Sequence, residues 1–152
     1  MENLLISACL LGVRCRYDGE SCPNLAVEAL MERYNLIPVC PEQLGGLPTP
    51  RTPSERVQGA VKTKTGEDVT EQYLRGAGQA LHLAKLFSCR KAVLKARSPS
   101  CGSGEIYDGT FTGALTAGDG VTAELLKANG ITVYGEGEQS LTEFLCSVSH
   151  ST

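Results

Sequence analysis

The sequence predicts an α/β protein, in which a three-layer Rossmann- or flavodoxin-like sandwich is built around a short, mostly parallel sheet of about four strands. Short apolar runs alternate along the chain with segments whose apolar residues recur at helical spacing. Strands that alternate with helices form right-handed βαβ units and hence a parallel sheet. No repeat or linker interrupts this alternation in the 152 residues, so we expect one domain over residues 1–152.

Four apolar runs are expected to form the strands. They cover residues 3–8, 35–40, 91–96 and 131–135. The first run, NLLISA, stops at Cys9 and a turn at Gly12. Such short and apolar runs are typical of strands buried on both faces, as in a parallel sheet.

Four segments, residues 23–35, 70–88, 120–130 and 139–148, are expected to be helices. Pro23 opens the first, where a helix tolerates proline, and Gly130 ends the third. The residues at helical spacing are Leu25, Ala26, Ala29, Leu30 and Tyr34 in the first helix, and Leu74, Ala77, Leu81, Ala84 and Phe87 in the second. Residues 41–59 hold four of the seven prolines and are expected to be a long loop, which in a compact domain is usually functional.

Composition and charge disfavour several classes of partner. The formal net charge is −3, so no basic face recommends DNA or an anionic membrane. No apolar run approaches the roughly 20 residues that a membrane-spanning helix needs. The N-terminal segment has no basic region before its apolar stretch, so we expect no secretory signal and a cytoplasmic protein.

The seven cysteines provide the most informative pattern. A reducing compartment disfavours disulfides, and the absence of a CxxC pair gives little support to a zinc ribbon or a thioredoxin-type site. Cys9, Cys40 and Cys101 each follow a predicted strand. Because ligands bind outside the carboxyl ends of the strands in parallel sheets, we expect these three thiols at one edge of the sheet.

The other cysteines divide into two groups. Cys15 stands six residues after Cys9 and could approach the site, so a fourth thiol ligand stays open. Cys22, Cys89 and Cys146 are expected to be small, incidental or buried hydrophobes.

Thiolates are soft ligands that select zinc, Cu(I) or iron–sulfur clusters. The two histidines, His82 and His150, do not follow these strands, so a mixed Cys/His zinc site finds little support. Three thiolates on a [4Fe–4S] cluster would leave one iron free as a Lewis acid. Such an iron binds sulfur well, which suggests a sulfur-containing substrate.

Polar side chains flank these thiols. Glu42 stands two residues beyond Cys40 and could act as a general base toward water if burial raised its pKa; the alternative is a solvated loop carboxylate. Ser98 and Ser100 precede Cys101 and could orient a substrate, although serines in turns usually bond their own backbone.

Four further side chains are candidates for substrate binding. Arg16, Tyr17 and Asp18 follow the first strand and either frame a pocket or form an exposed turn. Arg51 could hold an anion or bind a loop carbonyl.

Taken together, the motifs resemble those of a known family. SACLLG, RYDG, PVCPEQLGGLPTPRTPSE, DVT, LKARSPSCG, YDG and GVTAELL occur in this order from Ser7 to about Val133. This pattern resembles the small bacterial 2-thiouracil desulfurase family, long catalogued as a domain of unknown function. The resemblance implies an oxygen-labile [4Fe–4S] cluster held by Cys9, Cys40 and Cys101, with one iron free of protein ligands.

The resemblance also implies catalytic roles. Glu42 would be the essential acid and Ser98 the essential serine, with Ser100 as the alternative. The thione sulfur of 2-thiouracil would bind the free iron, Glu42 would take a proton from the water that attacks C2, and Ser98 would orient the base. Uracil and hydrogen sulfide would leave without net electron transfer. The expected partner is a small thiolated nucleobase, bound by a monomer or homodimer.

Three other hypotheses stay open at this point. A cluster enzyme could act on a different thiolated substrate or transfer sulfur. A non-catalytic cluster- or zinc-binding module would use Cys15 as a fourth ligand and would tolerate the loss of Glu42. A thiol redox sensor would place two cysteines within disulfide reach.

Overall fold

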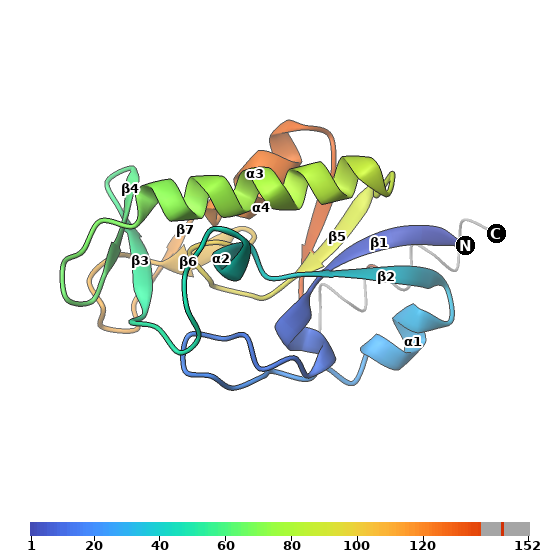
Figure 1. Ribbon diagram of the computed structural model, residues 1–152, viewed down its shortest axis with the longest axis horizontal. Coiled ribbons are helices and arrows are strands. Elements are labelled where there is room, and N and C mark those ends of the chain that lie inside the picture. The colour runs from blue at the N-terminus through green and yellow to red at the C-terminus, as the bar shows by residue number, and fades with distance from the viewer. Residues whose placement is uncertain (138–143, 145–152) are drawn as a thin grey trace.

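The computed structural model describes residues 1–137 and 144. Its centre is a four-stranded sheet in the order β2 (Tyr34–Val39), β1 (Glu2–Ser7), β5 (Lys91–Leu94) and β8 (Thr132–Gly135) (Figure 1). All three pairings are parallel. The prediction of an α/β fold around a short parallel sheet of about four strands is therefore confirmed.

The two central strands, β1 and β5, form the core of the sheet. Leu4, Leu5 and Ile6 are fully buried, as are Ala92 and Leu94. The chain leaves β1 toward β2 on one side and later crosses back to place β5 on the other side. The strand order therefore reverses between β1 and β5, and the crevice at this point is where α/β folds bind ligands.

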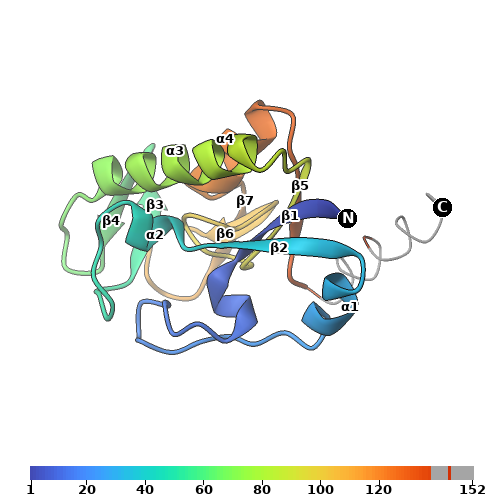
Figure 2. The same cartoon turned by 45° about the vertical axis from the view of Figure 1, so that its right-hand side comes forward.

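Helices cover both faces of the sheet. The helices α3 (Thr70–Leu86) and α4 (Val121–Ala128) lie on one face, while α1 (Val27–Met31) and the 3-10 helix η1 (Ala8–Leu11) lie on the other (Figure 2). The described part of the chain contains no helix that is long and apolar enough to span a membrane. The predicted last helix, 139–148, falls outside the described residues except for Phe144.

The first predicted helix, 23–35, is wrong in extent. Helix α1 covers only five residues, and Leu25 before it is 99% exposed. Tyr34 is buried because it belongs to β2, where its ring packs on Phe144 with a centroid distance of 5.5 Å. A residue buried by the sheet had matched the helical spacing by coincidence.

The buried face of α3 also differs from the predicted one. Of the predicted positions, Ala77 and Ala84 are buried, whereas Leu74 and Phe87 are 58% and 40% exposed. The buried residues of the helix are Tyr73, Gly76, Ala77, Ala80 and Ala84. Apart from Tyr73, the inward-facing residues are small, because α3 packs closely against its neighbours.

The contact between α3 and the short helix α2 (Pro41–Leu44) shows how close this packing is. A Cβ atom at Gly76 would lie 1.9 Å from the carbonyl oxygen of Pro41, and one at Gly45 would lie 2.0 Å from that of Gln72. These two glycines therefore allow α2, which carries Glu42, to rest directly on α3.

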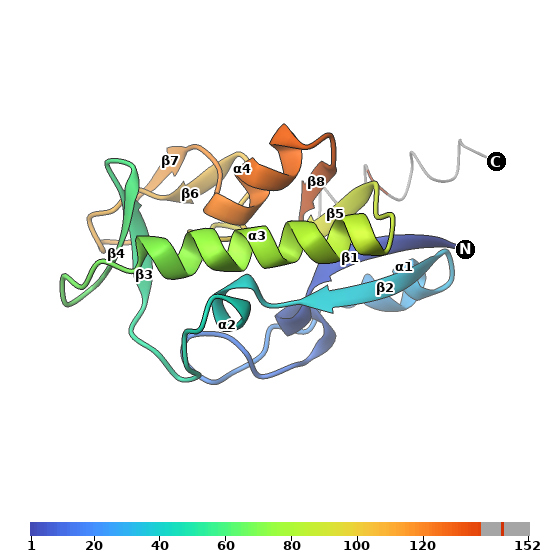
Figure 3. The ribbon, with the colours of Figure 1, turned by 45° about the horizontal axis from the view of Figure 1, so that its top comes forward.

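The predicted loop 41–59 is not without structure. It contains α2 and the strand β3 (Ser54–Val57), which pairs with β4 (Ala60–Thr63). A second hairpin joins β6 (Glu105–Tyr107) to β7 (Leu115–Ala117). Both hairpins lie at the end of the molecule away from the N-terminus (Figures 1 and 3). The hairpin strands are short and mix polar with apolar residues, so they show neither an apolar run nor a clear alternation, and the sequence did not reveal them.

Candidate active site

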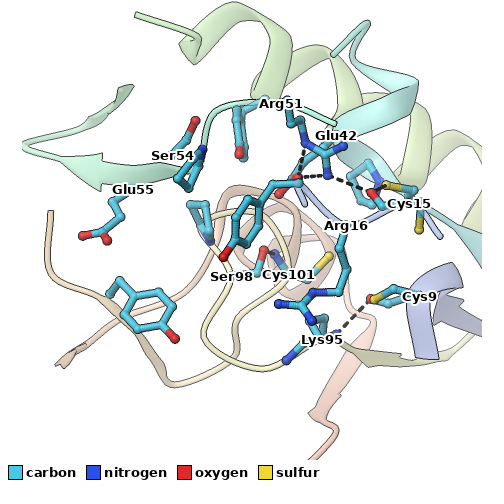
Figure 4. A pocket seen from close by; sticks show the side chains of 18 of the residues that line it. Cys9, Cys15, Arg16, Glu42, Arg51, Ser54, Glu55, Lys95, Ser98 and Cys101 are labelled. Atoms are coloured by element: carbon cyan, nitrogen blue, oxygen red, sulfur yellow. Dashed lines mark hydrogen bonds and ion pairs between the residues drawn. The ribbon is translucent and has the colours of Figure 1, made fainter. Parts of the chain in front are cut away.

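A cavity of about 380 Å³ lies at the carboxyl edge of the sheet. Its walls come from the segments that follow β1, β2 and β5 and from the two hairpins. The residues on its wall that bear directly on chemistry are Cys9, Cys15, Arg16, Glu42, Arg51, Ser54, Glu55, Lys95, Ser98 and Cys101 (Figure 4). Cys40 and Tyr73 also line the cavity. The cavity thus lies where the strand order reverses.

Four thiols, rather than three, line this cavity. Cys9 lies in η1, Cys40 immediately precedes α2, and Cys101 lies in the loop after β5. Cys15 joins them: it is 2% exposed, within hydrogen-bonding reach of the Cys9 and Cys40 thiols, and its carbonyl oxygen accepts a bond of 3.7 Å from Cys40 Sγ. The structure thus brings together the three thiols predicted from strand ends and adds the one whose position was open.

The remaining described cysteines lie elsewhere. Cys22 donates from Sγ to Glu136 Oε2 over 3.9 Å, and Cys89 is buried in the core. Neither lines the cavity. Cys146 is outside the described residues.

The environment of three pocket thiols, Cys15, Cys40 and Cys101, raises their pKa and favours the protonated form. Burial raises the pKa of Cys101 to about 12, although bonds from Ser7 and Ser100 oppose the shift. A hydrogen bond to Cys15 and burial together raise the pKa of Cys40 far above its ordinary value. A metal that binds these thiols must therefore displace their protons.

The loop that carries Cys101 is fixed to the start of α4. The backbone N–H groups of Val121 and Thr122 donate to the carbonyl oxygens of Pro99 and Ser100, each over 2.8 Å. The N–H groups at a helix start lack partners within the helix, and here this loop supplies them. The hydroxyls of Ser100 and Thr122 also bond to each other, over 2.8 Å in a buried position, so Ser100 does not line the cavity.

Ser98 does line the cavity. Its Oγ accepts hydrogen bonds of 3.0 Å from the backbone N–H groups of Ser100 and Cys101. Because a hydroxyl has two acceptor positions and one donor, the hydrogen of Ser98 is left to donate to another group.

Glu42 and Arg51 form a buried ion pair. The side chains are 15% and 7% exposed, and Nε of Arg51 donates to Glu42 Oε2 over 2.9 Å, with a second contact from Nη2 to the same oxygen. Arg51 also donates to the carbonyl oxygen of Cys15 over 2.9 Å. Burial alone would lower the pKa of Arg51, but Glu42 outweighs it and the net shift is upward.

Of the three candidate substrate-binding residues that follow β1, Arg16 and Tyr17 line the cavity, whereas Asp18 does not. Asp18 is exposed and stands 3.9 Å from the guanidinium of Arg16. The backbone N–H of Arg51 donates to the carbonyl oxygen of Tyr17 over 2.7 Å, which ties this turn to the segment before β3.

Several residues in or beside the site were not identified from the sequence. Tyr73 is 3% exposed, lies within hydrogen-bonding reach of Glu42 and Ser54, and has its pKa raised by burial. Ser7 Oγ accepts from the backbone N–H of Lys95 over 2.9 Å, and Lys95 pairs with Glu136. A polar serine at the end of an apolar strand is a signal for Ser7, but no local pattern indicates Tyr73.

The donors of the cavity fit an iron–sulfur cluster. Its thiols are soft ligands, and His82 is exposed on α3, away from the cavity. Within residues 1–137 and 144, no three His, Cys, Asp or Glu side chains surround one point as a single metal ion requires. The ligands of a cluster bind different metal atoms and need not converge on one point.

The fold and the cavity together define an α/β protein with a thiol-rich site at the carboxyl edge of its sheet. The chain belongs to the 2-thiouracil desulfurase family, whose sequence profile matches residues 4–138. The resemblance that the motifs indicated is therefore confirmed.

Two comparisons extend over nearly the whole chain. YbbK of Bacillus subtilis (strain 168), described as an uncharacterized protein, is 43% identical over 145 residues, which cover 89% of this chain and 96% of YbbK. A solved structure of TudS, described as a [4Fe–4S]-dependent thiouracil desulfidase, is 45% identical, with a TM-score of 0.89 and coverage of 98% of this chain and 99% of that one.

Proposed function

We propose that this protein is a desulfurase that converts 2-thiouracil to uracil and hydrogen sulfide, with a [4Fe–4S] cluster held by Cys9, Cys40 and Cys101. The observation that carries the proposal is that these strand-end thiols share one cavity with Glu42 and Ser98 in a chain of the desulfurase family. TudS, which is similar over its full length, is described as [4Fe–4S]-dependent.

When bound, such a cluster supplies an iron Lewis acid with affinity for sulfur. The chain supplies the groups that position the base and move protons. Part of the cavity wall is formed by buried side chains, among them Cys15 and Tyr73, and a polar interaction beside them is stronger than it would be in bulk water.

Glu42 is assigned the role of general base. Both contacts from Arg51 fall on Oε2, so Arg51 does not occupy Oε1. Oε1 is then the atom that accepts the proton from the water that attacks C2 of 2-thiouracil. Arg51 is then a positioning residue, since it holds Glu42 in one orientation through two bonds from a rigid guanidinium.

Ser98 is assigned to orient the thiolated base. Its oxygen is held by two backbone N–H groups, and its remaining hydrogen is available to a polar atom of the ring. Arg16 and Tyr17 are the candidates for further substrate contacts, because they line the cavity.

We further infer that the protein works as one domain in the cytoplasm on a small thiolated base, as a monomer or homodimer and without DNA. The net charge of −3 gives no support to a nucleic-acid surface.

Anaerobic reconstitution with iron and sulfide tests the proposal, followed by metal analysis, a visible spectrum and a 2-thiouracil turnover assay on the same sample. We expect the wild type to hold one [4Fe–4S] cluster per chain and release uracil, and Cys101→Ala to do neither. Cys89→Ala is the matched control, because Cys89 is a buried thiol outside the cavity, and it should retain both properties.

Two results would change the assignment. A cluster without turnover would reject 2-thiouracil as the substrate. Loss of the cluster in Cys15→Ala would show that the fourth thiol is a ligand and would contradict an iron free of protein ligands.

A further inference from the structure

The tip of the β6–β7 hairpin forms the wall of the cavity opposite Cys9 and Cys15. Tyr107, Phe111 and Gly113 of this hairpin line the cavity. Glu55, which binds the hairpin tip, lies on the side of the cavity away from Cys9 and Cys15 (Figure 4). A substrate whose sulfur points toward the thiols would therefore extend its ring toward this hairpin.

Phe111 has an unusual backbone conformation. Its φ angle is 57°, in the left-handed region that residues with a bulky side chain rarely adopt. The sequence offers glycines on both sides, Gly109 and Gly113, yet an aromatic residue takes the strained position. Strain of this kind persists only where the surrounding structure fixes it, and it is concentrated at ligand-binding sites.

A buried carboxylate holds Phe111 in place. Glu55 is 8% exposed, and its Oε1 accepts hydrogen bonds from the backbone N–H groups of Gly109 over 2.9 Å and Phe111 over 3.1 Å. The same segment rests on β3, because a Cβ atom at Gly109 would lie 2.7 Å from the carbonyl oxygen of Arg56. The tip is thus fixed by a side chain and by a close backbone contact.

We infer that Phe111 is a specificity-determining residue that offers its ring as a stacking face for a planar heterocycle, and that Glu55 is the positioning residue that holds it there. The inference deepens the proposed function and rests on it for the identity of the base. Aromatic rings bind flat conjugated bases by stacking, largely without regard to the substituents on the base. Phe111 therefore selects planar rings, while Ser98 and the thiol end of the cavity distinguish the groups attached to them.

The test uses the reconstituted protein and measures the binding of 2-thiouracil and of its product uracil by calorimetry, along with kcat and KM. Phe111→Leu keeps an apolar side chain but loses the ring, and we expect it to weaken the binding of both bases by about tenfold. We expect KM to rise by a similar factor while the iron content and Tm stay at wild-type values. Phe111→Tyr keeps the ring and should bind like the wild type.

Substitutions of Glu55 form the second part of the experiment. Both backbone bonds fall on Oε1, and Glu55→Gln keeps an acceptor oxygen there, so it should retain wild-type affinity. Glu55→Ala should raise KM as Phe111→Leu does. If Glu55→Gln were as impaired in kcat as Glu55→Ala, the charge would serve the chemistry and the positioning role would be wrong.

The outcomes separate this inference from the proposed function. Wild-type affinity in Phe111→Leu, with turnover intact, would overturn the stacking role and leave the desulfurase assignment standing. Binding of both bases without turnover in the wild type would reject 2-thiouracil as the substrate, while the loss of affinity in Phe111→Leu would still support stacking. Failure of the wild type to bind either base would overturn the inference.

Discussion

At the scale of single residues, Asp119 connects the loop after Cys101 with helix α4. Its Oδ1 accepts hydrogen bonds from the backbone N–H of Gly104 over 2.8 Å and from Nζ of Lys127 over 2.9 Å. Its backbone oxygen accepts from Arg56 over 2.7 Å. The side chain of Asp119 therefore ties the loop of a proposed cluster ligand to the helix that supports this loop, and its backbone oxygen adds a contact with strand β3.

The titration of Asp119 gives a test of this connection. Partial burial would raise its pKa, but the bonds from Lys127 and Gly104 outweigh burial and hold the pKa below the ordinary value of 3.8. A folded-state pKa below the unfolded one stabilises the protein above the unfolded value, and this contribution is lost as the pH falls through the folded value. We expect Asp119→Asn to lower the free energy of unfolding by about 1 kcal/mol at neutral pH.

Urea denaturation of both proteins at neutral and at strongly acidic pH measures this difference. It should disappear in acid, where the wild-type carboxylate is protonated. An equal loss of stability at both pH values would show that the substitution disturbs packing and not charge.

At the scale of elements, the contact between α2 and α3 sets the position of Glu42. Helix α2 has four residues, too few to be stable by itself. It is held by a backbone approach that only glycine permits at position 76. The placement of the general base thus depends on the small-residue face of α3.

Two glycines of α3 form a matched pair for testing this dependence. We expect Gly76→Ala to lower the free energy of unfolding by about 2 kcal/mol and to reduce kcat, because the new methyl group displaces Pro41 and with it Glu42. Gly78 is exposed and has nothing within 4 Å of its Cβ position. Gly78→Ala should therefore stabilise the helix by about 0.5–1 kcal/mol and leave kcat unchanged.

Thermal and urea denaturation together with steady-state kinetics measure both variants. If the Gly76→Ala protein folds and keeps the wild-type kcat, then α2 can shift without displacing the carboxylate of Glu42.

At the scale of the whole molecule, the proposed cluster ligands come from three segments that are far apart in the sequence. Cys9, Cys40 and Cys101 follow β1, β2 and β5, and a group bound by all three would link the carboxyl ends of these strands. A ligand that binds only the folded state stabilises it. The cofactor should therefore contribute to stability as well as to chemistry.

Removal of iron provides the corresponding prediction. An anaerobic chelator should lower the Tm of the reconstituted wild type by several degrees. The Tm of Cys101→Ala should not respond to the chelator, because this variant should hold no cluster. Differential scanning calorimetry of both proteins, with and without chelator, measures this. If the wild type lost its visible spectrum but kept its Tm, the cluster would not link the strand ends as proposed.

Much of the sheet was predictable because its strands are encoded locally. The apolar runs ending near Ser7, Val39 and Leu94 mark buried strands, and the rule that parallel strands end at one edge placed the following cysteines together. The faces of helices were less predictable. On α3, Leu74 is exposed and Gly76 is buried, because close helix packing favours small residues and reverses the usual hydrophobic signal.

The sequence by itself determined the α/β class, the parallel sheet and the edge at which three thiols gather, since each follows from local patterns and strand direction. Only the tertiary structure brought Cys15 to the same thiols, Tyr73 to Glu42, and Glu55 to the backbone of Phe111. These contacts join residues that are 6 to 56 positions apart and belong to different helices, loops and hairpins. Their partners are chosen by the packing of the whole chain, which no short stretch of sequence encodes.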